Sequence, residues 1–174
     1  MPEEEKAKLR KEEILKKAYE LGFRYERDYH GCAQSVLLAV QEVFGMEDPA
    51  VFRSATGLTG GLGLSINGPC GALTGGIMAL SQRYGRERNK IEDLEGIRFK
   101  SYELARKLCQ RFLDEYGSLS CRDIQRKIFG RAYELADPRE FEKFVKAGGH
   151  TEKCPLVVGK AASWVAEIIL AYET

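Results

Sequence analysis

GLTGGLGLSINGPCGALTGG, residues 57–76, is the stretch that decides how the rest of the chain is interpreted. Eight of its twenty residues are glycine, so its backbone can take left-handed conformations and approach other groups closely. The apolar run from Ala72 to Leu80 predicts that a helix follows directly. Cys70 is therefore expected at a helix N-terminus, where free N–H groups and the helix dipole lower the pKa of a thiol.

The remainder of the chain shows helical spacing of apolar residues and no convincing strand pattern. We predict an all-α fold, a compact helical bundle with a glycine-rich loop and cysteines at helix N-termini. Residues 1–29 are expected to contain a charged N-terminal helix, at about 3–23. This helix is expected to belong to the same domain as residues 30–174, which form the four-cysteine helical redox domain. The other helices are expected at about 32–44, 49–56, 70–84, 91–116, 122–129, 138–148 and 154–172, with the last at the centre of the bundle.

Four of the five cysteines begin a predicted helix: Cys32, Cys70, Cys121 and Cys154. Cys109 instead lies within a helix, where a small buried apolar residue is expected. Four thiolates at close range would repel one another, so either they do not meet or a positive group holds them together. An iron–sulfur cluster or a zinc ion would serve, although the long separations differ from the Cys-x₂-Cys pairs of ordinary zinc and ferredoxin sites. Two dithiol–disulfide pairs are the metal-free alternative.

The order of these residues is similar to the C_GCAxxG_C_C family of redox-active proteins. Cys32, then the Cys70-Gly71-Ala72-Leu73-Thr74-Gly75 motif, then Cys121 and Cys154 carry the resemblance, which extends from about His30 to Tyr172. The chain also resembles a region of split-Soret cytochromes, which carry haem and an iron–sulfur centre. It has no Cys-x-x-Cys-His sequence, so covalent haem is not expected. Because genes of the family often lie near transporters, the resemblance also implies a metal sensor or carrier as an alternative.

Composition restricts the partners. The formal net charge of +1 gives no electrostatic reason to expect nucleic acid or an anionic membrane. The longest apolar run, 161–171, is interrupted by Ser163 and Glu167, and the charged N-terminus is unlike a secretory signal. We therefore expect a cytoplasmic protein without a membrane span. Its N-terminal helix is expected to be a solvated face or a contact in a homodimer.

The weaker candidates are two histidines and the glycines of the loop. His30 and His150, near Cys32 and Cys154, are interpreted as polar loop residues, with metal ligation or proton transfer as the alternative. The loop lacks a following Lys-Ser/Thr and a preceding strand, which argues against a phosphate cradle. Gly71 and Gly75 lie four residues apart, so one helical face is expected to pack closely against a helix or a bound group.

These observations together predict a redox protein. Our preferred interpretation is an iron–sulfur or other metal site with Cys32, Cys70, Cys121 and Cys154 as ligands and Gly71 and Gly75 packed beside it. It would transfer electrons to or from a partner protein, or sense redox state. The alternative is a metal-free thiol–disulfide or peroxide-handling enzyme that uses the same cysteines.

Overall fold

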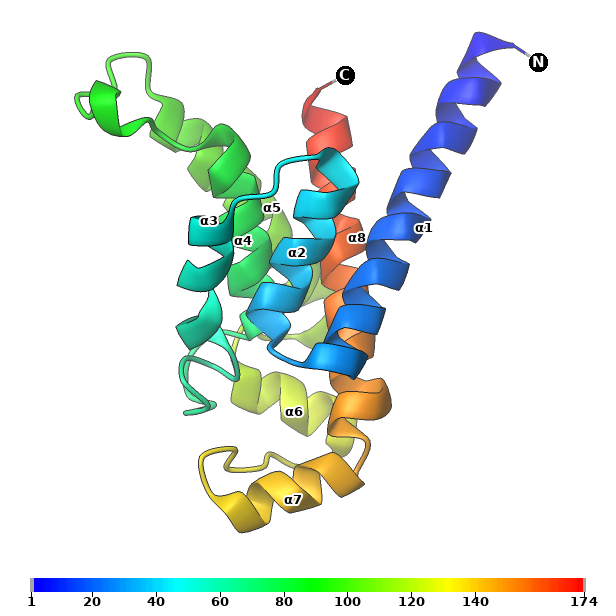
Figure 1. Ribbon diagram of the computed structural model, residues 1–174, viewed down its shortest axis with the longest axis vertical. Helices are drawn as coiled ribbons and strands as arrows, with labels where there is room; N and C mark the ends of the chain where they lie inside the picture. The colour runs from blue at the N-terminus through cyan, green and yellow to red at the C-terminus, as the bar shows by residue number, and fades with distance from the viewer. Residues whose placement is uncertain (1, 174) are drawn as a thin grey trace.

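The computed structural model describes residues 2–173, and every regular element among them is helical (Figure 1). The all-α prediction is confirmed. The α-helices are α1 (Glu3–Tyr29), α2 (Cys32–Phe44), α3 (Pro49–Ser54), α4 (Gly71–Tyr84), α5 (Ile97–Tyr116), α6 (Cys121–Phe129), α7 (Pro138–Lys146) and α8 (Cys154–Tyr172). Two short 3₁₀ turns, η1 (Thr56–Leu58) and η2 (Arg88–Lys90), and a π-helical turn, η3 (Gly149–Lys153), complete the set.

Helix α8 is the centre of the bundle, as its apolar sequence predicts. It packs against α1, α2, α4 and α5, and residues such as Val158, Ala162 and Ile169 are fully buried there (Figure 1). Helices α2 and α4 also pack directly against each other. This main core therefore brings the N-terminal ends of α2, α4 and α8 toward one end of the molecule.

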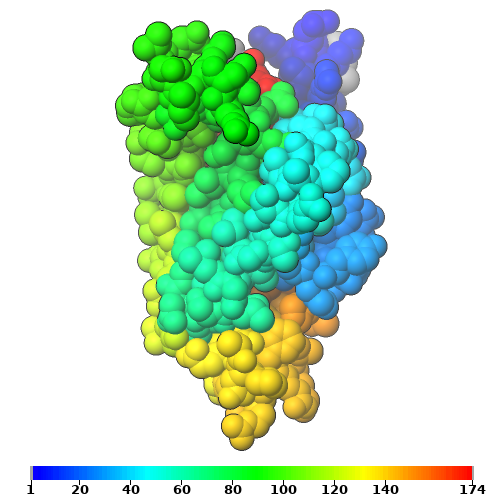
Figure 2. Space-filling model, turned by 60° about the vertical axis from the view of Figure 1, so that its left-hand side comes forward, coloured from blue at the N-terminus to red at the C-terminus, as the bar shows by residue number. Residues whose placement is uncertain are grey.

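That end is closed by α6 and α7. A second, smaller core forms there around Ile66, Tyr133, Leu135 and Phe144. Figure 2 shows the segment that contains α7 covering the lower end of the bundle. The two cores meet at the cysteines, since Cys70 belongs to the main core and Cys121 to the smaller one.

Two predicted helix boundaries are wrong. Helix α1 continues to Tyr29, beyond the predicted end at about residue 23. Residues 24–29 keep helical geometry, although Glu26 is the only buried residue among them. Helix α5 begins at Ile97, not at 91, since Asp93 takes a left-handed conformation (φ 53°) that ends the preceding turn. Its carboxylate then accepts hydrogen bonds from the N–H groups of Ile97 and Arg98. Leu94, which falls within the predicted helix, is 96% exposed.

One helical stretch among the described residues, Gly149–Tyr172, is long and apolar enough to cross a membrane by length and composition. The sequence analysis did not predict this, because it considered only the run 161–171 and judged it to be interrupted by Ser163 and Glu167. Here the stretch forms the centre of the bundle, and a buried core helix meets the same criterion.

Candidate functional site

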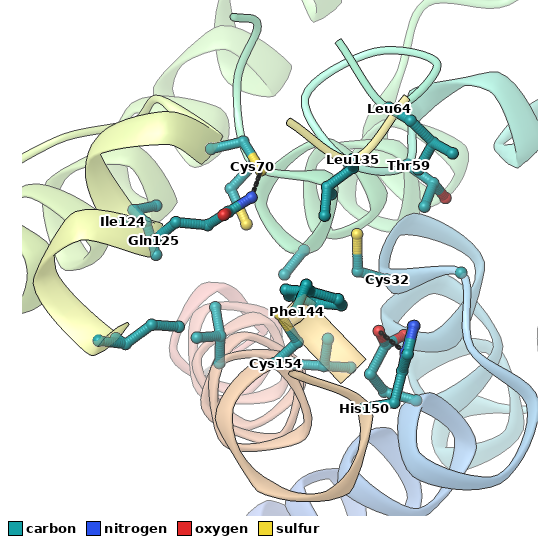
Figure 3. Close-up of a pocket in the computed structure, with 18 of the residues that line it drawn as sticks. Cys32, Thr59, Leu64, Cys70, Ile124, Gln125, Leu135, Phe144, His150 and Cys154 are labelled. Atoms are coloured by element: carbon teal, nitrogen blue, oxygen red, sulfur yellow. Dashed lines mark hydrogen bonds and ion pairs between the residues drawn. The ribbon is translucent and has the colours of Figure 1, made fainter. Parts of the chain in front are cut away.

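All four helix-start cysteines line one cavity between the main and the smaller core (Figure 3). Its volume is about 60 Å³. Apolar side chains form most of the wall, among them Leu64, Ile124, Leu135, Phe144 and Val157. No lysine or arginine among residues 2–173 lines it. The structure therefore brings together four thiols, from four separate segments, in a cavity without a protein cation.

The segments that carry Cys70 and Cys121 are joined by a single antiparallel bridge between Pro69 and Ser120. The N–H of Cys70 donates to the carbonyl of Leu119 at 2.8 Å, and the N–H of Cys121 donates to the carbonyl of Gly68 at 3.0 Å. The end of the glycine-rich loop thus pairs with the segment before α6. This pairing fixes the backbones of two cysteines that are far apart in sequence.

Cys32 is held against the start of α4 by a glycine. A Cβ placed on Gly71 would lie 2.3 Å from Sγ of Cys32, so no larger residue fits while this sulfur stays in place. One turn later, a Cβ on Gly75 would lie 2.1 Å from the carbonyl oxygen of Ala33 in α2. The predicted close packing of Gly71 and Gly75 is therefore confirmed. It involves a cysteine of the site at Gly71 and a neighbouring helix at Gly75.

Cys154 differs from the prediction, because α8 does not begin freely at this residue. The π-helical turn η3 precedes it without interruption, and the N–H of Cys154 donates to the carbonyl of Gly149. Its backbone N–H is thus already bonded. The argument from a free helix N-terminus does not hold at Cys154.

The expected lowering of the thiol pKa values is wrong at all four positions. Burial, together with a smaller contribution from the neighbouring Cys121, raises the pKa of Cys70 to about 12. Burial likewise raises the pKa of Cys121, and that of Cys32 and Cys154 well above the ordinary thiol value. In this apolar cavity, the cost of removing a thiolate from water outweighs the stabilisation that a helix N-terminus gives it. Without an added positive group, the thiols are protonated at neutral pH.

Three of the four sulfurs nevertheless have N–H donors directed at them. The N–H groups of Ala72 and Leu73 bond to the sulfur of Cys70, and that of Gly60 bonds to the sulfur of Cys32. Nε2 of Gln125 lies 3.6 Å from Sγ of Cys121. Each of these bonds favours the thiolate and lowers the pKa of its thiol. These N–H donors suit anionic sulfur, although burial in the apolar cavity opposes ionisation of the thiols.

The donor from Gly60 comes from a strained part of the loop. Residues 60–64 all have positive φ, including Leu62 at 71° and Leu64 at 65°. L-residues rarely adopt this region, and each such residue costs about 1–3 kcal/mol. The segment makes a left-handed turn that directs the Gly60 N–H at the cysteine cavity. The glycines supply the conformational freedom that the sequence predicts, and two leucines share the strain.

A polar group adjoins the sulfurs on one side of the cavity. The Glu26 carboxyl is buried and accepts a hydrogen bond from Ser35, and burial raises its pKa to about 8. Nδ1 of His150 lies 4.0 Å from Oε1 of Glu26. The ring of His30, which is exposed, lies on that of His150 with centroids 3.8 Å apart. Burial, together with a smaller contribution from His30, lowers the pKa of His150 to about 4, so His150 is neutral at neutral pH.

Glu26, Thr59 and Gln125 were missed by the sequence analysis. The predicted first helix ended before Glu26. Nothing local marks Thr59, whose buried hydroxyl has no hydrogen-bond partner among residues 2–173. Gln125 carried a usable signal, since it lies four residues after Cys121 and hence on the same helical face.

Cys109 lies elsewhere. It does not line the cavity and packs, partly buried, at the edge of the main core in α5. Within residues 2–173, no three histidine, cysteine or carboxylate side chains lie close enough to hold a single metal ion. The four cysteines thus surround a shared space and do not converge on one point.

The fold and the cavity define a class: helical proteins in which four cysteines from separate segments share one apolar site. A family model described as "Putative redox-active protein (C_GCAxxG_C_C)" matches residues 30–168, and the chain belongs to this family. The resemblance found in the cysteine motif is therefore confirmed. A comparison with curated proteins gives no match, and a comparison with solved structures gives none either.

Proposed function

We propose that this redox-active protein binds an iron–sulfur cluster through Cys32, Cys70, Cys121 and Cys154 and transfers electrons or senses redox state. The observation that carries the proposal is the shared cavity, into which four segments of the chain each bring one cysteine. Such a cluster, when bound, gains or loses an electron while thiolates hold its irons. An electron donor or acceptor protein is the partner that this function requires.

Charge supports a metal group in the cavity. Four thiolates in an apolar cavity without lysine or arginine would be strongly unfavourable, as the raised pKa values indicate. A bound cation stabilises a coordinating thiolate and releases its proton. The N–H groups of Gly60, Ala72 and Leu73 would then donate to anionic sulfurs, an arrangement that also tunes the potential of a cluster.

Spacing favours a cluster over a single zinc ion. Tetrahedral ligation at about 2.3 Å places sulfurs roughly 3.8 Å apart, and three of them would then form a compact group. The described side chains contain no such group, although four cysteines line the same cavity. Ligands of different irons lie farther apart, because the cluster stands between them. The absence of a side chain at Gly71 leaves the sulfur of Cys32 free beside this space.

A second candidate function rests on the bridge between the Cys70 and Cys121 segments. The joined segments would allow the two thiols to form a disulfide if their sulfurs meet, with two electrons passing to an acceptor such as a partner's disulfide and two protons released. The raised pKa of both thiols argues against fast exchange, because the thiolate is the reactive form. Thiol–disulfide chemistry is therefore the alternative and not the main proposal.

Anaerobic purification and reconstitution with iron and sulfide test the proposal. We expect visible absorption bands of sulfur-to-iron charge transfer, together with iron and acid-labile sulfide bound to the protein. A protein that takes up zinc alone would indicate a single-ion site. A metal-free protein with two reversible disulfides would refute the cluster and support the thiol enzyme.

A further inference from the structure

His150 has an unusual environment for a histidine. Both ring nitrogens are buried and neither has a hydrogen-bond partner among the described residues. An unpaired buried polar group costs about 1–3 kcal/mol, so such an arrangement calls for a partner that the protein chain itself does not supply. His30, by contrast, bonds through Nδ1 to the carbonyl of Glu26 at 2.9 Å.

The position of the His150 ring is fixed by three other rings. Phe141 and Phe144 pack against it with centroids 5.7 and 5.2 Å away, and His30 lies on it from the solvent side. His150 lines the same cavity as the four cysteines, and Figure 3 shows its side chain on the side of the cavity where Cys32 and Cys154 lie. The ring is thus held at the site and cannot easily turn to solvent.

The four sulfurs differ in the groups that act on them most strongly. An N–H donor is among these groups at Cys32, Cys70 and Cys121, whereas at Cys154 burial, Glu26 and the other three cysteines all raise the pKa. His150 precedes Cys154 by four residues in a continuous helical stretch, so the two lie about one turn apart on the same face.

We propose that His150 donates a hydrogen bond from Nε2–H to the anionic sulfur at the Cys154 corner of the site and so raises its reduction potential. The inference rests on the proposed function, since it concerns the same cluster. In this proposal His150 is the neutral tautomer with its hydrogen on Nε2, and Nδ1 then lies 4.0 Å from Oε1 of Glu26, beyond hydrogen-bond distance. A donor stabilises the more negative, reduced cluster, and its loss lowers the potential.

The test compares reduction potentials of reconstituted variants. His150→Phe keeps the ring packed against Phe141 and Phe144 but removes the donor, while His150→Gln keeps an N–H group. His30→Phe is the matched control, because His30 is exposed, does not line the cavity, and its ring lies on that of His150. We expect H150F to titrate at a lower potential than the wild type, H150Q to recover part of the difference, and H30F to match the wild type.

Other outcomes are equally informative. An H150F protein with full iron content and the wild-type potential would overturn the inference alone, as would equal shifts in H150F and H30F. If H150F fails to fold, pulsed electron–nuclear double resonance on the wild type with ¹⁵N-labelled histidine decides. A weak ¹⁵N coupling supports the donor, and its absence overturns it. A wild type that binds no iron and sulfide would refute the proposed function first.

Discussion

The sharpest structural prediction concerns Gly75, where α4 passes closest to α2. A Cβ at this position would lie 2.1 Å from the carbonyl oxygen of Ala33 and 2.7–2.8 Å from its carbonyl carbon and Cα. All three atoms are backbone, so no side chain can rotate away to make room. Gly75→Ala, the smallest possible change, therefore acts directly on the spacing of the two helices.

The magnitude follows from this geometry. Ordinary contacts begin near 3.4 Å, so α2 and α4 must separate by roughly 1.3 Å along this contact (3.4 − 2.1). Overpacking of this kind costs about 1–3 kcal/mol, and a rigid backbone contact belongs at the upper end. Alanine gains about 1 kcal/mol over glycine in a helix. We expect G75A to lower the free energy of unfolding by about 2 kcal/mol.

Urea denaturation of the reduced, metal-free protein measures this loss. Gly57→Ala is the matched control, because a Cβ at Gly57 meets no atom within 4 Å and its φ is not positive. A G75A protein within about 0.5 kcal/mol of the wild type, beside an unchanged G57A, would refute the close contact, since surface substitutions alone produce changes of that size.

Two further predictions concern charge. In the metal-free protein, ionisation of Glu26 opposes folding as pH rises from 4.5 toward about 8, and protonation of His150 opposes it as pH falls from 6.5 toward about 4. The slopes offset each other between 4.5 and 6.5. Between pH 6.5 and about 8, stability falls by at most about 1.4 kcal/mol per pH unit, and urea unfolding of E26Q should show no such fall in this range. Asp93→Ala removes the hydrogen bonds to the N–H groups of Ile97 and Arg98, and thermal unfolding should show a loss of about 1 kcal/mol.

The helices were largely predictable because their signals are local. Apolar spacing and adjacent glycines located α2 and α4. The start of α5 failed for a physical reason. Ile91 and Leu94 continue the apolar spacing although both are exposed, while Asp93 and Gly96 both take left-handed conformations before the helix begins at Ile97.

The site was less predictable, since its properties arise from contacts distant in sequence. The motif identified the four cysteines, yet the bridge between Pro69 and Ser120 joins segments about fifty residues apart. The expected thiol pKa was wrong because a helix N-terminus acts locally, whereas burial depends on the whole fold. Glu26 lies in a polar stretch of sequence, and only the tertiary structure shows that it is buried.

The central claim is that four cysteines, and not the fifth, hold one iron–sulfur cluster. The most direct test is the amount of iron and acid-labile sulfide per chain after anaerobic reconstitution of the wild type and the five single Cys→Ala variants. We expect loss of bound iron in the variants of Cys32, Cys70, Cys121 and Cys154, and wild-type content in C109A. Full iron content in any of those four variants, or none in the wild type, would contradict the account.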